Sequence, residues 1–215
     1  MPSTKSEKMA APDLRIMNLR DLIPHEMVIH KHVAKILETI KFDGRQRDPI
    51  IVDRASSVVL DGTHRLRALT LAGATFAVVC LVDYDSIEMG RWLRQASTGS
   101  LKHLAEESNL KSLVSVYPPA KALQMVDNYE TAFGLYSEQE AYVSNSSFND
   151  IVEAYLLSEQ IEHVLRSRKM RFSLIPDSTS VGDISSFSSA QTILYTPRIE
   201  KTDVLHNAIL GRLFP

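Results

Sequence analysis

The 215-residue sequence is poor in the residues that mark specialised protein classes. Its single cysteine, Cys80, excludes an intramolecular disulfide framework and a zinc site built from cysteines, and favours a reducing, cytoplasmic compartment. With only 8 glycines and 9 prolines the chain is neither fibrous nor of low complexity. No apolar run approaches the roughly 18 residues of a membrane span. The formal net charge of −2 argues against a dedicated binder of nucleic acid or of anionic membranes.

What is present is the composition of an ordinary soluble globular protein, with 44% hydrophobic and 23% charged residues. The first ninety residues predict a compact α/β unit, because short apolar runs alternate with a 3.6-residue helical period. The expected elements are a strand at 14–17, a helix at 30–41, strands at 49–52 and 58–60, a helix at 64–72 capped by Thr63, and a strand at 76–82.

The second half of the sequence predicts mainly helices. The expected helices are 86–95, 118–133, 148–168 and 201–210. A Ser-rich stretch at 173–189 is either a loop or an excursion between strands at 171–175 and 192–195. We therefore expect an α/β (α+β) protein with a small mixed sheet in residues 10–85 and a mainly helical second domain in residues 86–215. The last helix is expected to pack back on the first domain.

The segment with the clearest chemical signal runs from Val58 to Leu69, where a strand passes through Gly62 directly into a helix. A helix N-terminus reached through a tight glycine turn exposes free amides and the positive end of the helix dipole, which together bind phosphate. His64, Arg65 and Arg67 add side-chain donors, and Asp61 is placed to hold Mg²⁺ or to orient a hydroxyl. The alternative is a capped turn with no ligand.

Other residues carry weaker local signals. Glu26 follows Pro24 in a loop ahead of a helix, and on local grounds it is a solvated acid. Three histidines lie near it at positions 25, 30 and 32, but no acidic or cysteine partner recurs at ligand spacing, so we expect them on the surface. The pattern around Trp92 favours a core side chain.

Four short segments together resemble the ParB/sulfiredoxin superfamily: Ile23–Glu26, Asp43-Gly44, Arg47–Val52 and Leu60–Arg65. More narrowly, they are similar to the free serine kinases, nucleotide-dependent enzymes that phosphorylate L-serine to O-phospho-L-serine. The match continues at 82–84, at Trp92 and in the last twenty residues, from Thr196-Pro197-Arg198-Ile199 to Leu213-Phe214-Pro215. Residues 10–85 would then be a nucleotide-binding domain, and residues 86–215 a substrate or lid domain.

The resemblance implies a role for each matched residue. Glu26 and Asp61 would be the catalytic carboxylates. We assign Glu26 as the general base and Asp61 as the Mg²⁺ ligand or hydroxyl-orienting partner, with the reverse assignment open. The turn made by Gly62, Thr63, His64 and Arg65 would hold the phosphates of ATP or ADP. Trp92 would help to form the pocket of a small substrate, L-serine or a similar hydroxy amino acid.

Two departures from related proteins leave alternatives open. Sulfiredoxin activity needs a cysteine in the phosphate turn, where this sequence has Thr63, so that activity is excluded. Similar kinases continue past a Phe-Pro like Phe214-Pro215 into a short tail bearing Lys, Thr, Arg and His; here the tail is cut off, the amino-acid site is built otherwise, or activity is lost. The alternatives to a kinase are a ParB-like DNA partition or transcription regulator and a degenerate nucleotide or amino-acid sensor.

Overall fold

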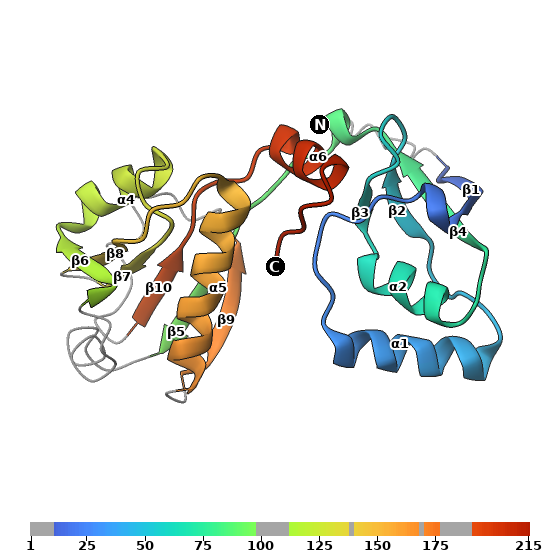
Figure 1. Ribbon diagram of the computed structural model, residues 1–215, viewed down its shortest axis with the longest axis horizontal. Helices are drawn as coiled ribbons and strands as arrows, with labels where there is room; N and C mark the ends of the chain where they lie inside the picture. The colour runs from blue at the N-terminus through green and yellow to red at the C-terminus, as the bar shows by residue number, and fades with distance from the viewer. Residues whose placement is uncertain (1–10, 98–111, 138–139, 168–169, 177–190) are drawn as a thin grey trace, which may run out of the picture. The chain divides into compact units, whose positions relative to one another are not determined.

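The computed structural model describes residues 11–97, 112–137, 140–167, 170–176 and 191–215, and these form two compact units (Figure 1). Unit 1 comprises Met1–Ile87 with Ala208–Gly211, and unit 2 comprises Glu88–Asn207 with Arg212–Pro215. Most of the Ser-rich stretch expected between two strands lies outside the described residues. Among the described helices, none is long and apolar enough to cross a membrane.

Unit 1 is built on a mixed sheet with the strand order β1-β4-β2-β3. Its elements are β1 (Asp13–Asn18), η1 (Leu19–Asp21), α1 (His30–Asp43), β2 (Ile50–Asp53), β3 (Val59–Asp61), α2 (Thr63–Leu71), β4 (Phe76–Val82) and η2 (Tyr84–Ser86). β1 and β3 pair antiparallel with their neighbours, whereas β2 and β4 are parallel, which requires the crossover that α2 provides. The predicted α/β unit with a small mixed sheet is confirmed.

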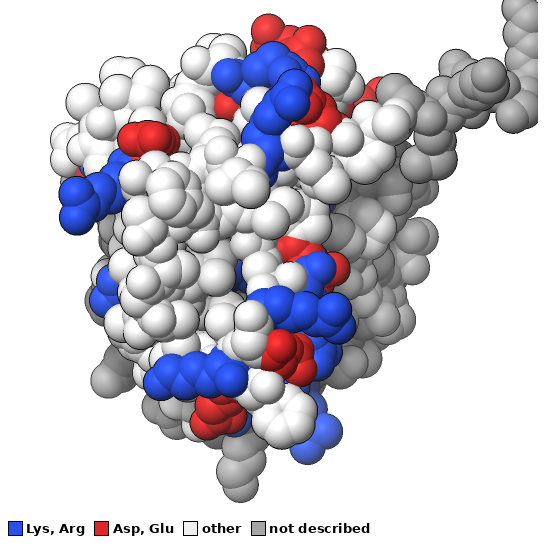
Figure 2. All heavy atoms as spheres, turned by 90° about the vertical axis from the view of Figure 1, so that its right-hand side faces the viewer, with Lys and Arg blue, Asp and Glu red and all other residues white. Residues whose placement is uncertain are grey.

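The helices of unit 1 cover one face of this sheet, with α2 packed on the strands and α1 packed on α2 (Figure 1). Alternation along β4 shows the two faces, because Ala77 and Val79 are buried whereas Phe76 and Val78 are 58% and 39% exposed. Opposite Val78 on β1, Ile16 is 74% exposed. Figure 2 views this unit from the side and shows a broad area without charged side chains between groups of both signs.

Unit 2 is built on a second sheet, with the strand order β6-β8-β7-β10-β5-β9 and antiparallel pairing throughout. Its strands are β5 (Trp92–Ser97), β6 (Val114–Tyr117), β7 (Gly134–Tyr136), β8 (Ala141–Ser144), β9 (Phe172–Pro176) and β10 (Gln191–Tyr195). Its helices are α4 (Pro119–Asp127) and α5 (Ile151–Ser167), and α6 (Lys201–Ile209) runs to the division between the units. The prediction of a mainly helical second domain is wrong.

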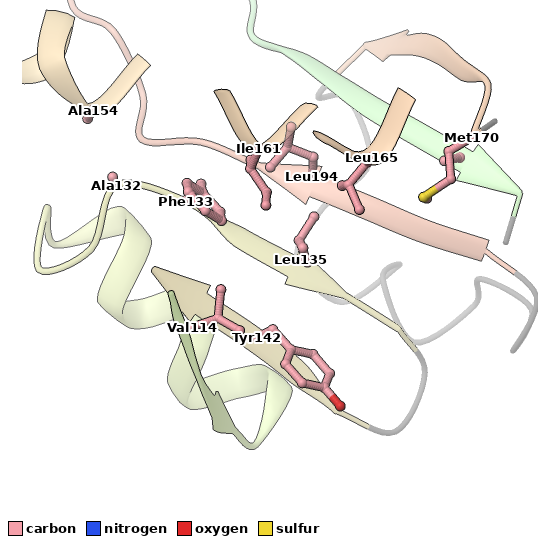
Figure 3. Packing of buried hydrophobic residues seen from close by; sticks show 11 residues of the cluster. Val114, Ala132, Phe133, Leu135, Tyr142, Ala154, Ile161, Leu165, Met170 and Leu194 are labelled. Carbon is pink, nitrogen blue, oxygen red and sulfur yellow. The ribbon is translucent and has the colours of Figure 1, made fainter. Parts of the chain in front are cut away.

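The error has a physical cause, because both faces of this sheet are covered. Leu194 and Leu135 point to the side of α5, where they meet Ile161 and Leu165 (Figure 3). The neighbouring residue Ile193 packs on the opposite side with residues of α4. A strand buried on both faces shows no alternation of polar and apolar residues, so its sequence cannot be told from that of a buried helix.

The predicted helices therefore had different outcomes. Those at 148–168 and 201–210 are confirmed as α5 and α6. The predicted helix at 86–95 is instead the end of η2 followed by β5. The predicted helix at 118–133 stops at Asp127, since Tyr129 adopts a left-handed backbone with φ of 60° and the chain then enters β7.

Candidate functional site

The turn between β3 and α2 has the strand–glycine–helix geometry that the sequence predicts, but its cap is different. Gly62, not Thr63, occupies the N-cap position, with φ of 104° and ψ of 20°. This left-handed conformation is one that glycine adopts without strain. Because glycine offers no side-chain cap, the amides of the first turn of α2 have no side-chain partner from the cap residue.

Two buried polar atoms in this turn lack hydrogen-bond partners among the described residues: the hydroxyl Oγ1 of Thr63 and the guanidinium Nε of Arg65. Another nitrogen of Arg65, Nη2, donates to Oδ2 of Asp61 at 2.5 Å. Leaving a buried donor unpaired costs about 1–3 kcal/mol, and more when the donor is charged. An anion rich in oxygen atoms, bound at the helix N-terminus, would satisfy both atoms.

Glu26 lies in a loop that is tied to the same turn. The amide of Ile29 donates to Nε2 of His64 at 3.0 Å, so the proton of the neutral His64 ring is on Nδ1. The Glu26 side chain is 49% exposed, and its Oε1 lies 3.4 Å from Nε2 of His25. Hydrogen bonding and charge from His25 outweigh partial burial and lower the pKa of Glu26. Its carboxylate is therefore ionised at neutral pH.

Glu26 and the turn share one pocket of about 570 Å³. All five residues predicted at this end of unit 1 line it together with Glu26: Asp61, Gly62, Thr63, His64 and Arg65. Arg67, which the sequence suggested as a further donor, is exposed on α2 and does not line the pocket. The local sequence signal was therefore strong enough to place the turn, and the fold brings Glu26 to it.

Sequence reasoning missed the opposite wall of the pocket, which comes from α1 and the loop after it. Lys35, Arg45 and Arg47 contribute cations, and Ile36 and Ile40 contribute apolar surface. The signal for these residues was weak: two arginines follow Gly44, which ends α1 with φ of 65°.

The loop that carries the two arginines is held by Gln46. The side chain of Gln46 donates to the carbonyl of Val78 at 2.7 Å and accepts from the amide of Val78 at 2.9 Å. Gln46 thus bonds to the β4 backbone one residue before the pairing of β2 with β4 begins at Val79. These two hydrogen bonds hold the loop beside the pocket.

The histidines near Glu26 do not all lie on the surface as predicted. The His25 side chain is only 11% exposed, and Nδ1 of its ring donates to the carbonyl of Val59 at 2.5 Å. His30 is exposed, and His32 lines the pocket with its ring centroid 5.6 Å from that of His64. Among the described residues no group of three or more His, Cys, Asp or Glu side chains could hold a metal ion.

Trp92 is the first residue of β5 in unit 2, and it pairs with Pro176 of β9. It is 59% exposed, so the core position favoured by its sequence pattern is wrong. The matched residues Thr196 and Pro197 come directly after β10, the strand that pairs with β5. There the hydroxyl of Tyr155 donates to the carbonyl of Pro197 at 2.9 Å and lies 3.2 Å from Oγ1 of Thr196.

No protein-family model matches the chain. A ParB-like protein of Sulfolobus acidocaldarius is 31% identical over 111 residues, which are 51% of this chain and 51% of that protein. The ADP-dependent L-serine kinase SerK of Thermococcus kodakarensis is 25% identical over 133 residues, 59% of this chain and 54% of the relative. The chain thus matches about half the length of these curated relatives.

Solved structures extend the likeness to almost the whole chain. A free serine kinase in complex with ADP superposes with a TM-score of 0.73 at 17% identity, covering 99% of this chain and 88% of that one. The chain therefore has a ParB/sulfiredoxin-like fold. Within that class it resembles the free serine kinases.

Proposed function

We propose that this protein is a nucleotide-dependent kinase that transfers a phosphoryl group from ADP or ATP to the hydroxyl of L-serine, giving O-phospho-L-serine. The observation that carries the proposal is the pair of unpartnered buried donors, Thr63 Oγ1 and Arg65 Nε, at the N-terminus of α2. The names of the related proteins point to the same chemistry, because SerK is an ADP-dependent L-serine kinase and the structural relative is a free serine kinase with bound ADP.

The nucleotide phosphates would bind at the turn formed by Gly62, Thr63, His64 and Arg65. The first-turn amides, the Thr63 hydroxyl and the Arg65 guanidinium donate to phosphate oxygens there, and Nδ1–H of His64 is a further donor. Phosphoryl transfer depends mainly on positioning and on neutralising charge. Lys35 and Arg45, on the facing wall, supply that charge in place of the lysine of a Walker loop, which this sequence lacks.

Asp61 fits a role as the protein ligand of Mg²⁺. Its side chain is 72% exposed, and one of its oxygens, Oδ2, is bonded to Arg65. Mg²⁺ keeps several waters and is usually held by one or two carboxylates plus substrate phosphates, so a site without three clustered protein ligands suits it. When bound, Mg²⁺ neutralises charge on the transferring phosphoryl group.

Glu26 would act as the general base. Its carboxylate is ionised at neutral pH and takes the hydroxyl proton of the acceptor as the hydroxyl oxygen attacks the terminal phosphorus. The bond to the leaving phosphate oxygen breaks, releasing AMP from ADP or ADP from ATP. Trp92, exposed at the start of β5, would contribute to the binding site of the amino acid.

The test is mass spectrometry of the purified full chain incubated with L-serine, Mg²⁺ and either ADP or ATP. We expect O-phosphoserine with at least one nucleotide, and none when Mg²⁺ is chelated. Parallel incubations with L-threonine and L-homoserine define the acceptor. Absence of any phosphorylated amino acid, together with DNA affinity that falls steeply with salt, would favour the ParB-type regulator instead.

A further inference from the structure

His25 contacts Glu26 from a fixed position in unit 1. The ring is largely buried, and Nδ1 is held at 2.5 Å by the backbone carbonyl of Val59, a β3 residue that is fully buried. The opposite ring nitrogen, Nε2, lies 3.4 Å from Oε1 of Glu26. His25 does not itself line the pocket. The ring thus connects the core of the sheet to the carboxylate of Glu26, which lines the pocket.

The hydrogen bond to Val59 fixes one proton of the His25 ring. A carbonyl oxygen can only accept, so Nδ1 of His25 carries a proton. If the ring were neutral, the lone pair of Nε2 would face a carboxylate oxygen and repel it. When the ring is protonated, Nε2–H faces Oε1 of the ionised Glu26 and the two side chains form an imidazolium–carboxylate pair.

We propose that His25 is a positioning residue for Glu26: anchored to Val59, it binds Oε1 of Glu26 and leaves Oε2 turned to the acceptor hydroxyl. This inference rests on the proposed function, in which Glu26 is the general base. In the reaction Oε2 receives the hydroxyl proton, while Oε1 stays in contact with Nε2 of His25. The lowered pKa of Glu26, whose largest cause is its bond to His25, agrees with the pairing.

The other titratable and charged groups near Glu26 come from β3, α2 and α1. A charge on His64 of α2 would also lower the pKa of Glu26, but the ring is neutral while its Nε2 accepts from the amide of Ile29. Arg65 and Asp61 bond to each other, and Lys35 and His32 of α1 line the same pocket. Within the described residues none of these forms a hydrogen bond or an ion pair with Glu26, so His25 is the group that orients this carboxylate.

Two substitutions separate the two contacts of the ring. In His25→Asn the side-chain amide nitrogen takes the place of Nδ1, so the bond to Val59 is kept and the donor to Glu26 is lost. In His25→Gln the amide nitrogen takes the place of Nε2, so a neutral donor to Glu26 is kept. The matched control is His30→Asn, since His30 is an exposed residue at the start of α1 and lies outside the pocket.

The first readout is the pH dependence of kcat/KM for serine phosphorylation. An opposite charge within about 4–6 Å lowers the pKa of a carboxyl group by about 1–3 units, so losing it moves the acid limb upward. We expect His25→Asn to shift the midpoint of the acid limb to higher pH by about one unit, and His25→Gln to shift it less. The KM for nucleotide should stay near wild type, and the control should match wild type throughout. An unchanged acid limb in His25→Asn would overturn the proposal, even with a lower Tm.

The second readout does not need activity. Carboxyl-labelled protein allows the titration of Glu26 to be followed by ¹³C NMR in wild type, His25→Asn and Glu26→Gln, the last to assign the signal. A higher midpoint for Glu26 in His25→Asn supports the pair even if wild type proves inactive, in which case the kinase assignment alone fails. An identical midpoint in both proteins would refute the pairing whatever the activity.

Discussion

The two units use their sheets in opposite ways. In unit 2 consecutive residues of β10, Ile193 and Leu194, are both 1% exposed, because α4 covers one face of the sheet and α5 the other. In unit 1 consecutive residues of β4 differ, with Val79 fully buried and Val78 39% exposed. Unit 2 thus gains stability from two packed faces, whereas unit 1 packs one face of its sheet.

Polar groups show the same contrast. In unit 2 the hydroxyl of Thr131 donates to the carbonyl of Ser144 at 2.9 Å. The buried hydroxyls of Tyr136 and Thr192 have no hydrogen-bond partner among the described residues, but they are uncharged and lie within strands of the sheet. In unit 1 the unpartnered atoms include a charged guanidinium nitrogen of Arg65 at a helix N-terminus. A charged donor left unpaired is the costlier case, which is why unit 1 holds the stronger candidate for ligand binding.

The largest expected effect separates chemistry from binding within unit 1. Glu26→Gln removes the base but keeps the size of the side chain, so we expect kcat for serine phosphorylation to fall by about 10²–10⁴-fold. Nucleotide affinity, measured by calorimetry, should stay near wild type. Glu38→Gln, on an exposed position of α1 outside the pocket, is the matched control. A fully active Glu26→Gln enzyme would remove Glu26 from the mechanism.

Truncating a side chain should lower the free energy of unfolding much more on a covered face of the unit 2 sheet than on the open face of the unit 1 sheet. Leu165→Ala leaves a cavity beneath α5, where Leu165 is fully buried, and we expect the free energy of unfolding to fall by about 2–5 kcal/mol. Ile16→Ala, on the open face of the unit 1 sheet where Ile16 is 74% exposed, should change it by less than about 0.5 kcal/mol. Denaturant titration measures both. A large loss in Ile16→Ala would show that this face is covered in solution.

Arg65→Ala tests the unpartnered donor directly. Hydrogen bonds to charged groups are worth about 1.5–3 kcal/mol, so we expect nucleotide affinity to weaken by roughly 10-fold to 150-fold. Arg67→Ala, two residues along α2 and exposed outside the pocket, should bind as wild type does. Isothermal titration with ADP distinguishes the two variants. Equal affinities would mean that the phosphates bind elsewhere.

Acid stability of unit 1 should depend on Asp53. Its carboxylate is buried, which would raise its pKa, but bonds from the amide and hydroxyl of Ser56 and from the amide of Tyr84 prevail and lower it. Stability from this group is therefore complete above the ordinary carboxyl pKa and is lost as the pH falls through the lower folded value. We expect Asp53→Asn to cost about 1–3 kcal/mol at pH 7 and to flatten the acid limb of the stability curve, whereas exposed Asp21→Asn changes neither.

The smallest effect concerns the glycine turn. A Cβ on Gly62 would lie 2.9 Å from Nε and Nη2 of Arg65, so Gly62→Ala must displace the guanidinium. We expect nucleotide affinity to fall by about 10-fold, the equivalent of one weakened charged hydrogen bond. Gly73→Ala has a similar backbone strain, with φ of 81° and open space around the Cβ, and should leave nucleotide affinity unchanged. Thermal melts would show that both variants are folded.

Much of unit 1 could be predicted because its signals are local. Val33, Ile36 and Ile40 recur at the helical period, and α1 forms where that period runs. The strands of unit 2 gave no such signal, since Leu93 and Ala96 of β5 are buried against different helices and only the pairing with β9 and β10 makes the segment a strand. Strand pairing between distant segments is a tertiary property.

The site also has one part that local sequence predicts and another that depends on tertiary structure. By itself the sequence determined the turn from Asp61 to Arg65, because glycine alone adopts the required backbone without strain and the helix after it exposes its amides whatever the surroundings. Only the tertiary structure decided that Glu26 and Lys35 face this turn and that His25 is anchored to Val59. These residues lie 26 or more positions from their partners. The packing of α1 on α2 and the bridge between Ile23 and the β3 segment bring them together.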